Sequence, residues 1–182
     1  MQTGWPMEYM KDALADYKNL KKRNLILFPH RIAPEKQPEI FRDLAKELPH
    51  YEFVVCQDKQ LTKHEYHTLL GEAKMVFSAN TQETLGISPY EGILVGAMPL
   101  VPDRLSYTEM YNDIWKYDST WTSSYANYEI NKHKLAEMIK NDMENYDKKL
   151  PKLFELEQEL THTYFSANNL LNTIHSYGKK EN

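Results

Sequence analysis

The sequence contains little cysteine and little glycine, and it has no long apolar run. Its single cysteine, Cys56, excludes a disulfide framework and a zinc site built from several cysteines. Its six glycines form neither a G-x-G-x-x-G nor a Walker A pattern, so we expect no glycine-rich phosphate loop. No apolar stretch approaches the ~20 residues that a membrane-spanning helix needs, and residues 1–10 lack the pattern of a signal peptide. We therefore predict a cytoplasmic protein without a transmembrane segment.

The charge balance is close to even. The 182 residues include 22 Lys and Arg against 26 Asp and Glu, which gives a net charge of −4. This balance excludes a strongly basic nucleic-acid-binding protein, although it leaves room for a local basic patch. A chain of this length buries roughly 70% of its unfolded surface when it folds. We therefore expect one globular domain, or one domain with an appendage.

Apolar runs alternate with helical patterns along the first two thirds of the chain. Continuous apolar runs predict four strands buried on both faces, at residues 25–28, 53–56, 75–77 and 98–101. Capping-box patterns begin predicted helices at Thr62 and at Ser88, and Ser106 opens a short one. This alternation predicts an α/β fold, a Rossmann-like, doubly wound parallel sheet with extra C-terminal helices.

We divide the chain into three segments. Residues 1–23 are predicted to be a linker and a leading helix, residues 24–128 a Rossmann-like domain, and residues 129–182 helices that pack on it. The Tyr-, Trp- and Ser-rich residues 112–128 have no secure assignment, but they have room for a fifth short strand followed by a loop.

Polar residues follow the first predicted strand, and ligands of open α/β sheets bind at the carboxyl ends of the strands. Arg31 and Lys36 place two cations there. Arginine grips phosphate with two hydrogen bonds and lysine acts as a compact charge, so together they could neutralise a diphosphate leaving group. A surface loop with ordinary salt bridges is the alternative.

A second polar loop follows the third strand and contains Glu83, Gly86, Ile87, Ser88 and Glu91. Glycine lets the backbone approach a ligand closely, and the amides that follow it converge on a helix N-terminus that suits a phosphate. The two carboxylates suit paired hydroxyls of a ribose or a hexose. The capping-box pattern gives Glu91 a structural alternative, whereas Glu83 has none. A third polar loop, residues 102–109, follows the fourth strand and could equally be a turn with a helix cap.

Together these loops resemble the C-terminal, donor-binding half of a GT-B glycosyltransferase of the retaining, family-4 type. Arg31 and Lys36 match its R-x4-K element, and Glu83 and Glu91 match its E-x7-E motif. The resemblance covers residues 24–111. His30 and Gln37 depart from it, because the family usually has glycine before the arginine and after the lysine. Residues 101–107 are also similar to glycosyltransferases that decorate nucleic acid, including queuosine-tRNA mannosyltransferase-like proteins.

The resemblance implies that residues 24–128 are the nucleotide-sugar-binding domain of a hexosyltransferase. Such an enzyme would transfer sugar from a UDP- or GDP-sugar with retention, to a nucleic acid or a glycan. The resemblance also implies catalytic roles for Arg31, Lys36 and Glu83. It adds a donor-binding set, which is His30, Gly86, Ile87, Ser88 and Glu91. The nucleotide sugar is the substrate, no cofactor is expected, and the two cations would replace a metal ion.

A GT-B enzyme also needs an N-terminal, acceptor-binding domain. We expect that domain to lie outside this chain, because Gly4-Trp5-Pro6 resembles the exit from an interdomain linker. The chain alone would then be incomplete for catalysis. A nucleotide-sugar 2-epimerase-like domain and a non-catalytic nucleotide-sugar-binding or interaction domain remain the alternatives.

Overall fold

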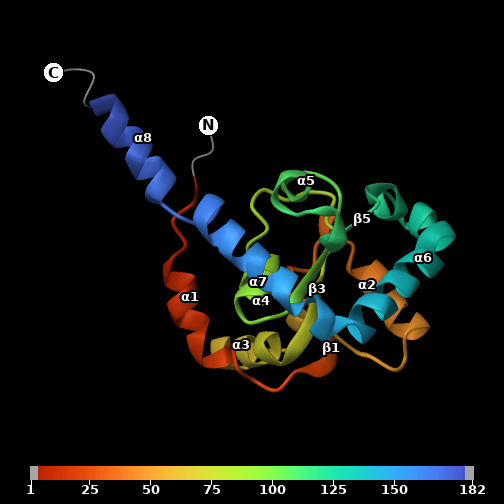
Figure 1. Ribbon diagram of the computed structural model, residues 1–182. Helices are drawn as coiled ribbons and strands as arrows, with labels where there is room; N and C mark the ends of the chain where they lie inside the picture. Colours follow the sequence, from red (N-terminus) through yellow and green to blue (C-terminus); the bar gives the residue numbers. More distant parts are fainter. Residues whose placement is uncertain (1–3, 179–182) are drawn as a thin grey trace.

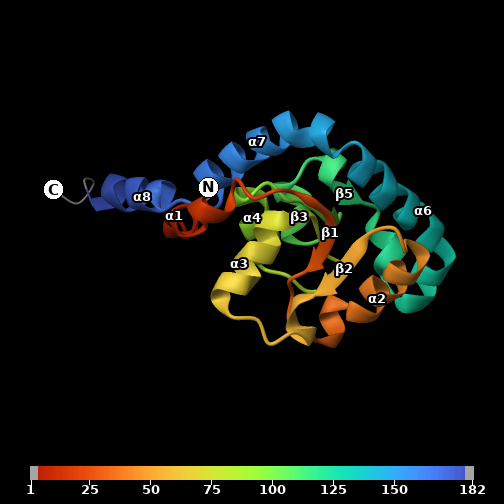
Figure 2. The ribbon, with the colours of Figure 1, turned by 90° about the horizontal axis from the view of Figure 1, so that it is seen from below.

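A five-stranded parallel sheet forms the centre of the molecule, with helices on both faces (Figures 1 and 2). The computed structural model describes residues 4–178. The strands are β1 (Arg23–Phe28), β2 (Glu52–Val55), β3 (Ala73–Phe77), β4 (Met98–Pro102) and β5 (Lys116–Tyr117), in the order β2-β1-β3-β4-β5. All neighbouring pairs are parallel, which confirms the predicted fold class and the short fifth strand.

Residues 4–178 contain eight α-helices, most of which connect or cover the strands. They are α1 (Tyr9–Leu14), α2 (Pro38–Glu47), α3 (Lys63–Glu72), α4 (Ile87–Leu94), α5 (Ser106–Met110), α6 (Tyr125–Glu144), α7 (Tyr146–Thr163) and α8 (Asn168–Gly178). Short 3-10 helices lie at Ala15–Tyr17, Pro34–Lys36, Cys56–Asp58, Asp113–Trp115 and Ser119–Thr122. Helices α2 and α6 contact each other beside the sheet, whereas α3 and α4 lie on the other face with α1 and α7 against α4 (Figure 2).

The sheet reverses its winding direction between β1 and β3. Leu27 pairs with Val54 of β2 on one side and with Val76 of β3 on the other, and all three are buried. The chain runs from β1 outward to β2, then returns to β3 and continues to β4 and β5. The loops after β1 and β3 therefore emerge side by side at the topological switch point, where open α/β sheets bind their ligands.

Two predicted helix starts are confirmed, that of α3 after Thr62 and that of α5 at Ser106, and one is wrong. Thr62 and Glu65 form the reciprocal capping box that starts α3. Helix α4 instead begins at Ile87, so Pro89 is its third residue and no capping box forms at Ser88. Gly86 is the N-cap, in a left-handed conformation with φ 67°. Helix α5 likewise lacks a side-chain cap, since its N-cap is Leu105.

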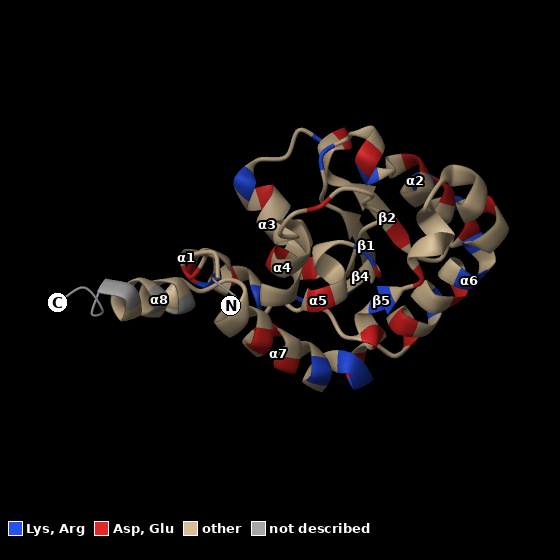
Figure 3. Ribbon diagram, turned by 90° about the horizontal axis from the view of Figure 1, so that it is seen from above, with Lys and Arg blue, Asp and Glu red and all other residues tan. Residues whose placement is uncertain are grey.

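One boundary between the predicted segments does not coincide with the end of a helix or strand. The boundary expected at 128/129 falls inside α6, and residues 1–3 and 179–182 of the outer segments lie outside the described residues. Helix α8 projects away from the sheet beside the start of the chain (Figure 1). Among the described helices, none has the length and apolar character that crossing a membrane requires. Lysine and arginine alternate with acidic residues over the helices (Figure 3).

Candidate active site

An ion pair joins the loops that leave β1 and β3. Lys36 Nζ lies 3.1 Å from Glu83 Oε2, and both side chains are largely buried, with 11% and 17% of their surface exposed. Lys36 also donates to the Gln82 carbonyl at 2.8 Å. Two further bonds fasten the loops together, since the Thr81 amide and hydroxyl both donate to the Glu35 carbonyl. The structure thus brings together the lysine and the first glutamate that the sequence singled out.

Glu83 is the centre of this site. Its Oε1 accepts hydrogen bonds from the Thr84 and Gly86 amides, at 3.0 and 3.2 Å. Its Oε2 accepts from Lys36, from Asn80 Nδ2 at 2.8 Å and, more distantly, from the Tyr107 hydroxyl at 3.5 Å. A carboxylate offers about four lone-pair positions, so these partners already use all of them.

The structural roles of the two glutamates are therefore the reverse of those expected. Glu83, assigned no structural role from the sequence, binds the backbone of the turn that leads into α4. Glu91, expected in a capping box, lies one turn inside that helix and has no capping partner there. The sequence pattern failed because the N-cap is Gly86, two residues before Ser88, in a left-handed conformation that the pattern does not report.

The surroundings of Glu83 keep it ionised. Burial alone would raise the pKa of its carboxyl, but the hydrogen bond and the charge of Lys36, with the Gly86 and Thr84 amides, outweigh burial and lower it. A permanent ion pair therefore sits at the switch point at neutral pH.

His30 lies in the same site and is neutral. It is 4% exposed, and its ring lies edge-on against Phe28 at 5.0 Å between centroids. Burial, assisted by the charge of Lys36, lowers its pKa to about 4. Its Nε2 is buried and, among the described residues, has no hydrogen-bond partner. A buried nitrogen of this kind is expected to gain a hydrogen-bond partner when water or a ligand enters the site.

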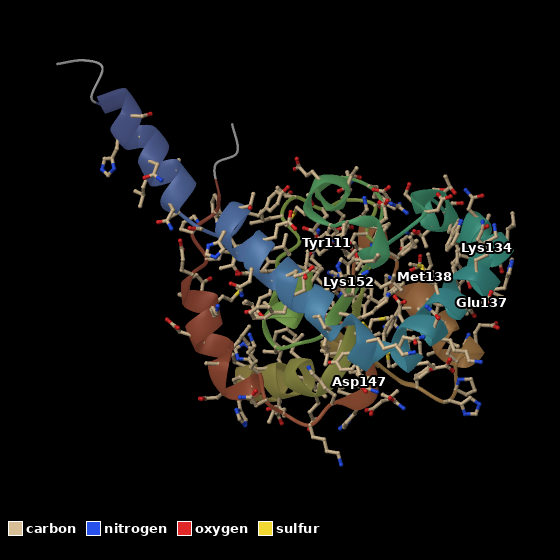
Figure 4. The ribbon with its side chains drawn as sticks, in the orientation of Figure 1. Tyr111, Lys134, Glu137, Met138, Asp147 and Lys152 are labelled. Carbon is tan, nitrogen blue, oxygen red and sulfur yellow. The ribbon has the colours of Figure 1, made fainter. Side chains whose placement is uncertain are left out.

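Another buried polar atom without a partner among residues 4–178 lies beside Glu83. It is Oδ1 of Asn80, whose Nδ2 donates to Glu83. Tyr111, labelled in Figure 4, is close enough that the charge of Glu83 helps burial to raise the pKa of its phenol. Asn80 and Tyr107 were not predicted from the sequence, although Asn80 lies three residues after the end of β3, where the strand-end rule could have found it.

Gln37 explains one departure from the family pattern. It has φ 52° and ψ 53°, a left-handed conformation that favours glycine, which is the residue the family usually has there. Its side chain offsets this cost, because Nε2 donates to the carbonyls of Ala79 and Thr122 at 2.6 and 2.8 Å.

Arg31 lies apart from the Lys36–Glu83 pair in this structure. Its side chain is 68% exposed and forms an ion pair with Glu35, four residues later. Exposed pairs of this kind contribute little to stability, so Arg31 could exchange Glu35 for an anion at small cost.

The start of α4 offers two unused amides. The Gly86 amide is bound to Glu83 and the Tyr90 amide to the Gly86 carbonyl. Across residues 4–178, the amides of Ile87 and Ser88 have no hydrogen-bond partner. These groups and the helix dipole suit an anion beside the ion pair.

Glu91 borders a second part of the site. It accepts a hydrogen bond from the Tyr66 hydroxyl at 2.8 Å, and burial raises the pKa of its carboxyl. Tyr66 also lines a cleft of about 360 Å³ at the ends of β1 and β2. The other lining residues are Pro29, Cys56, Gln57, Lys59, Gln60 and Leu61. The cleft is therefore lined by apolar side chains together with two glutamines and a lysine.

Groups of side chains that could hold a metal ion were sought among His, Cys, Asp and Glu. The described part of the chain contains no cluster of three or more of them.

Comparison with known proteins relates this chain to solved structures. It superimposes on HepE from Anabaena in complex with UDP with a TM-score of 0.61 at 12% identity, covering 95% of this chain and 56% of that one. It superimposes on the pneumococcal O-GlcNAc transferase GtfA in complex with UDP and GlcNAc with a TM-score of 0.60 at 14% identity, covering 98% and 38%. The chain thus spans about half or less of these proteins, and at these identities the likeness shows the fold. No family model and no curated protein matches the sequence.

Proposed function

We propose that this chain is the nucleotide-sugar-binding domain of a GT-B glycosyltransferase, which transfers a hexose from a UDP- or GDP-sugar to an acceptor. The observation that carries the proposal is the Lys36–Glu83 ion pair at the switch point, beside the unused amides at the start of α4. The likeness to two proteins whose structures hold UDP supports a UDP-sugar in particular.

Each part of the donor has a matching group. The diphosphate would lie between Lys36, the Ile87 and Ser88 amides and Arg31, once Arg31 exchanges Glu35 for phosphate. When the bond from the sugar to the diphosphate breaks, these groups stabilise the negative charge on the departing oxygen. We propose that the cations perform this task without a metal ion.

The nucleoside would occupy the cleft that Tyr66 lines, with the ribose hydroxyls on Glu91. The hexose would then lie near Glu83 and His30. All four lone-pair positions of Glu83 are in use, so a sugar hydroxyl has to replace its weakest partner or bind to the unpartnered His30 Nε2.

Retention of configuration, and a nucleic acid or a glycan as acceptor, are proposed from the family-4 resemblance. We propose that a further domain supplies the acceptor contacts, since the chain spans 56% of HepE and 38% of GtfA. The alternative enzyme is a nucleotide-sugar 2-epimerase-like domain, and the alternative from another class is a non-catalytic nucleotide-sugar-binding or interaction domain. Sugar transfer by a longer form of the protein, measured with a radiolabelled donor, would distinguish the transferase from both.

The test of donor binding is calorimetry with UDP, GDP, ADP, UDP-glucose, UDP-N-acetylglucosamine and GDP-mannose. We expect binding of at least one diphosphate in the micromolar to millimolar range, and loss of it in Lys36→Met. Lys132→Met, which removes a lysine paired with Glu47 on the surface, is the matched control and should bind normally. If the folded protein binds none of the six compounds, the proposed function is wrong.

A further inference from the structure

Tyr107 contacts the Glu83 loop at two points, although it comes from a different loop. It is fully buried and lies in α5, after β4. Its hydroxyl lies 3.5 Å from Glu83 Oε2, 3.3 Å from Asn80 Nδ2 and 3.5 Å from Ser78 Oγ. The hydroxyl therefore accepts from Asn80 and donates to Glu83, which places it between two groups at the end of β3.

The ring of Tyr107 supports the other end of the same turn. A Cβ atom added to Gly86 would lie 2.7 Å from Tyr107 Cε1, so the ring edge lies directly against the glycine backbone. Glu83 and Gly86 are joined by the hydrogen bond from the Gly86 amide to Glu83 Oε1. One side chain thus contacts the carboxylate through its hydroxyl and the left-handed turn through its ring.

The backbone before Tyr107 is strained. Leu105 has φ 56° and ψ −141°, a region close to one that almost only glycine adopts, and its side chain is 47% exposed. This conformation turns the chain so that Tyr107, two residues later, points beneath the β3 loop. Strain of this kind persists where the surrounding structure fixes the chain, and it is concentrated at functional sites.

We propose that Tyr107 is a positioning residue that orients the Glu83 carboxylate and thereby sets the affinity of the site for the hexose of a sugar nucleotide. The role in sugar binding rests on the proposed function, whereas the link from Tyr107 to Glu83 does not. The three contacts of the hydroxyl are longer than ordinary O–H···O hydrogen bonds, and such contacts in a site often shorten when substrate binds.

The variant that tests this is Tyr107→Phe, which removes the hydroxyl and keeps the ring beneath Gly86. Tyr111→Phe is the matched control. Tyr111 is also buried, its ring contacts that of Tyr107 at 5.6 Å, and its hydroxyl has no partner among the described residues. A third variant, Tyr107→Leu, removes the support of the ring as well.

The first readout is calorimetry with UDP, UDP-glucose and UDP-N-acetylglucosamine. We expect Tyr107→Phe to weaken binding of the sugar nucleotide about fivefold, which is the size of one ordinary hydrogen bond, and to change UDP binding less than about twofold. Tyr111→Phe should change neither, and Tyr107→Leu should weaken both ligands. Equal effects of Tyr107→Phe and Tyr111→Phe on the sugar nucleotide, or an equal effect of Tyr107→Phe on UDP and the sugar nucleotide, would overturn the proposal.

The second readout needs no ligand. Titration of the Glu83 carboxyl by NMR should show a higher pKa in Tyr107→Phe, because the ionised form loses a donor, and an unchanged pKa in Tyr111→Phe. An unchanged Glu83 pKa in both variants would overturn the link. If the wild-type protein binds none of the three nucleotides but the Glu83 pKa shifts as expected, the proposed function fails and the link from Tyr107 to Glu83 stands.

Discussion

Lys36 and Glu83 are 47 residues apart in the chain, and their side chains meet across the switch point of the sheet with Nζ 3.1 Å from Oε2. The pair is more than a local salt bridge, because Glu83 also binds the turn that starts α4. Its removal should therefore affect folding as well as ligand binding.

We expect Lys36→Met to lower the free energy of unfolding by about 2 kcal/mol, less than the ~3–5 kcal/mol for a fully buried pair, because it leaves the Glu83 carboxylate without its counterion. Glu83→Gln alone should also lower the free energy of unfolding, because it leaves the Lys36 ammonium without its counterion. The double variant should be more stable than the sum of the two effects predicts, by about 1 kcal/mol. Urea unfolding of the four proteins measures this coupling, and strictly additive effects would contradict it. Lys132→Met, which removes surface pairs with Glu47 and Asp43, should cost less than Lys36→Met.

Glu91→Gln should separate binding from stability. The amide oxygen of Gln can still accept from Tyr66, so the melting temperature should hardly change. Under the proposed function the variant loses charge-assisted bonds to the ribose, each worth roughly 1.5–3 kcal/mol, so the affinity for UDP should fall at least tenfold. UDP and UDP-glucose should be affected equally, because both carry the ribose. Unchanged affinity for both would remove Glu91 from the donor site. Tyr66→Phe, which keeps the charge of Glu91, should have a smaller effect.

Stability should depend on pH through His30. Its pKa is about 4 in the folded protein, against 6.5 as the ordinary value, because burial excludes the charged form. Above pH 6.5 both states are neutral. As pH falls from 6.5 towards 4, only the unfolded state takes up the proton, so stability falls. Between pH 7.5 and 5 we expect a loss of about 2 kcal/mol that is absent in His30→Gln.

Urea unfolding at pH 7.5, 6 and 5 measures the dependence on His30. The exposed His50 supplies the control, since His50→Gln should keep the pH dependence of the wild-type protein. A pH dependence in His30→Gln that equals the wild-type one would show that His30 is not buried as a neutral group.

Gly86→Ala should be more destabilising than Gly96→Ala. Both glycines have positive φ, 67° and 82°, so both substitutions carry the ~1–2 kcal/mol of a left-handed conformation. At Gly86 the new methyl group also meets the Tyr107 ring at 2.7 Å, whereas at Gly96 it meets the flexible side chain of Lys22 at 3.4 Å. Thermal unfolding of the two variants gives the comparison, and equal losses would show that the ring can move aside. Gly86→Ala should also weaken UDP binding, because the turn carries the amides of α4.

Several features of this protein followed from its sequence alone. The apolar runs gave the positions of the four long strands within two residues, because a strand buried on both faces admits few polar side chains. The alternation of strands and helices then predicted a doubly wound parallel sheet, and Thr62 and Glu65 gave a true helix start. Since such a sheet gathers the loops after its strands at one edge, the sequence also predicted that Lys36 and Glu83 belong to one site, and the family resemblance added His30.

The tertiary structure decided which atoms meet at that edge. Glu83 binds Lys36 and the start of α4, Arg31 pairs with Glu35, and Tyr66 and Tyr107 reach Glu91 and Glu83 from other elements. Hydrophobic periodicity reports which face of an element is buried, and it carries no information on how far two loops from different strands approach each other. The start of α4 at Ile87, with Gly86 as its N-cap, was missed for a related reason. A left-handed glycine can replace a side-chain cap, and only the packing of Tyr107 against that glycine fixes where the turn lies.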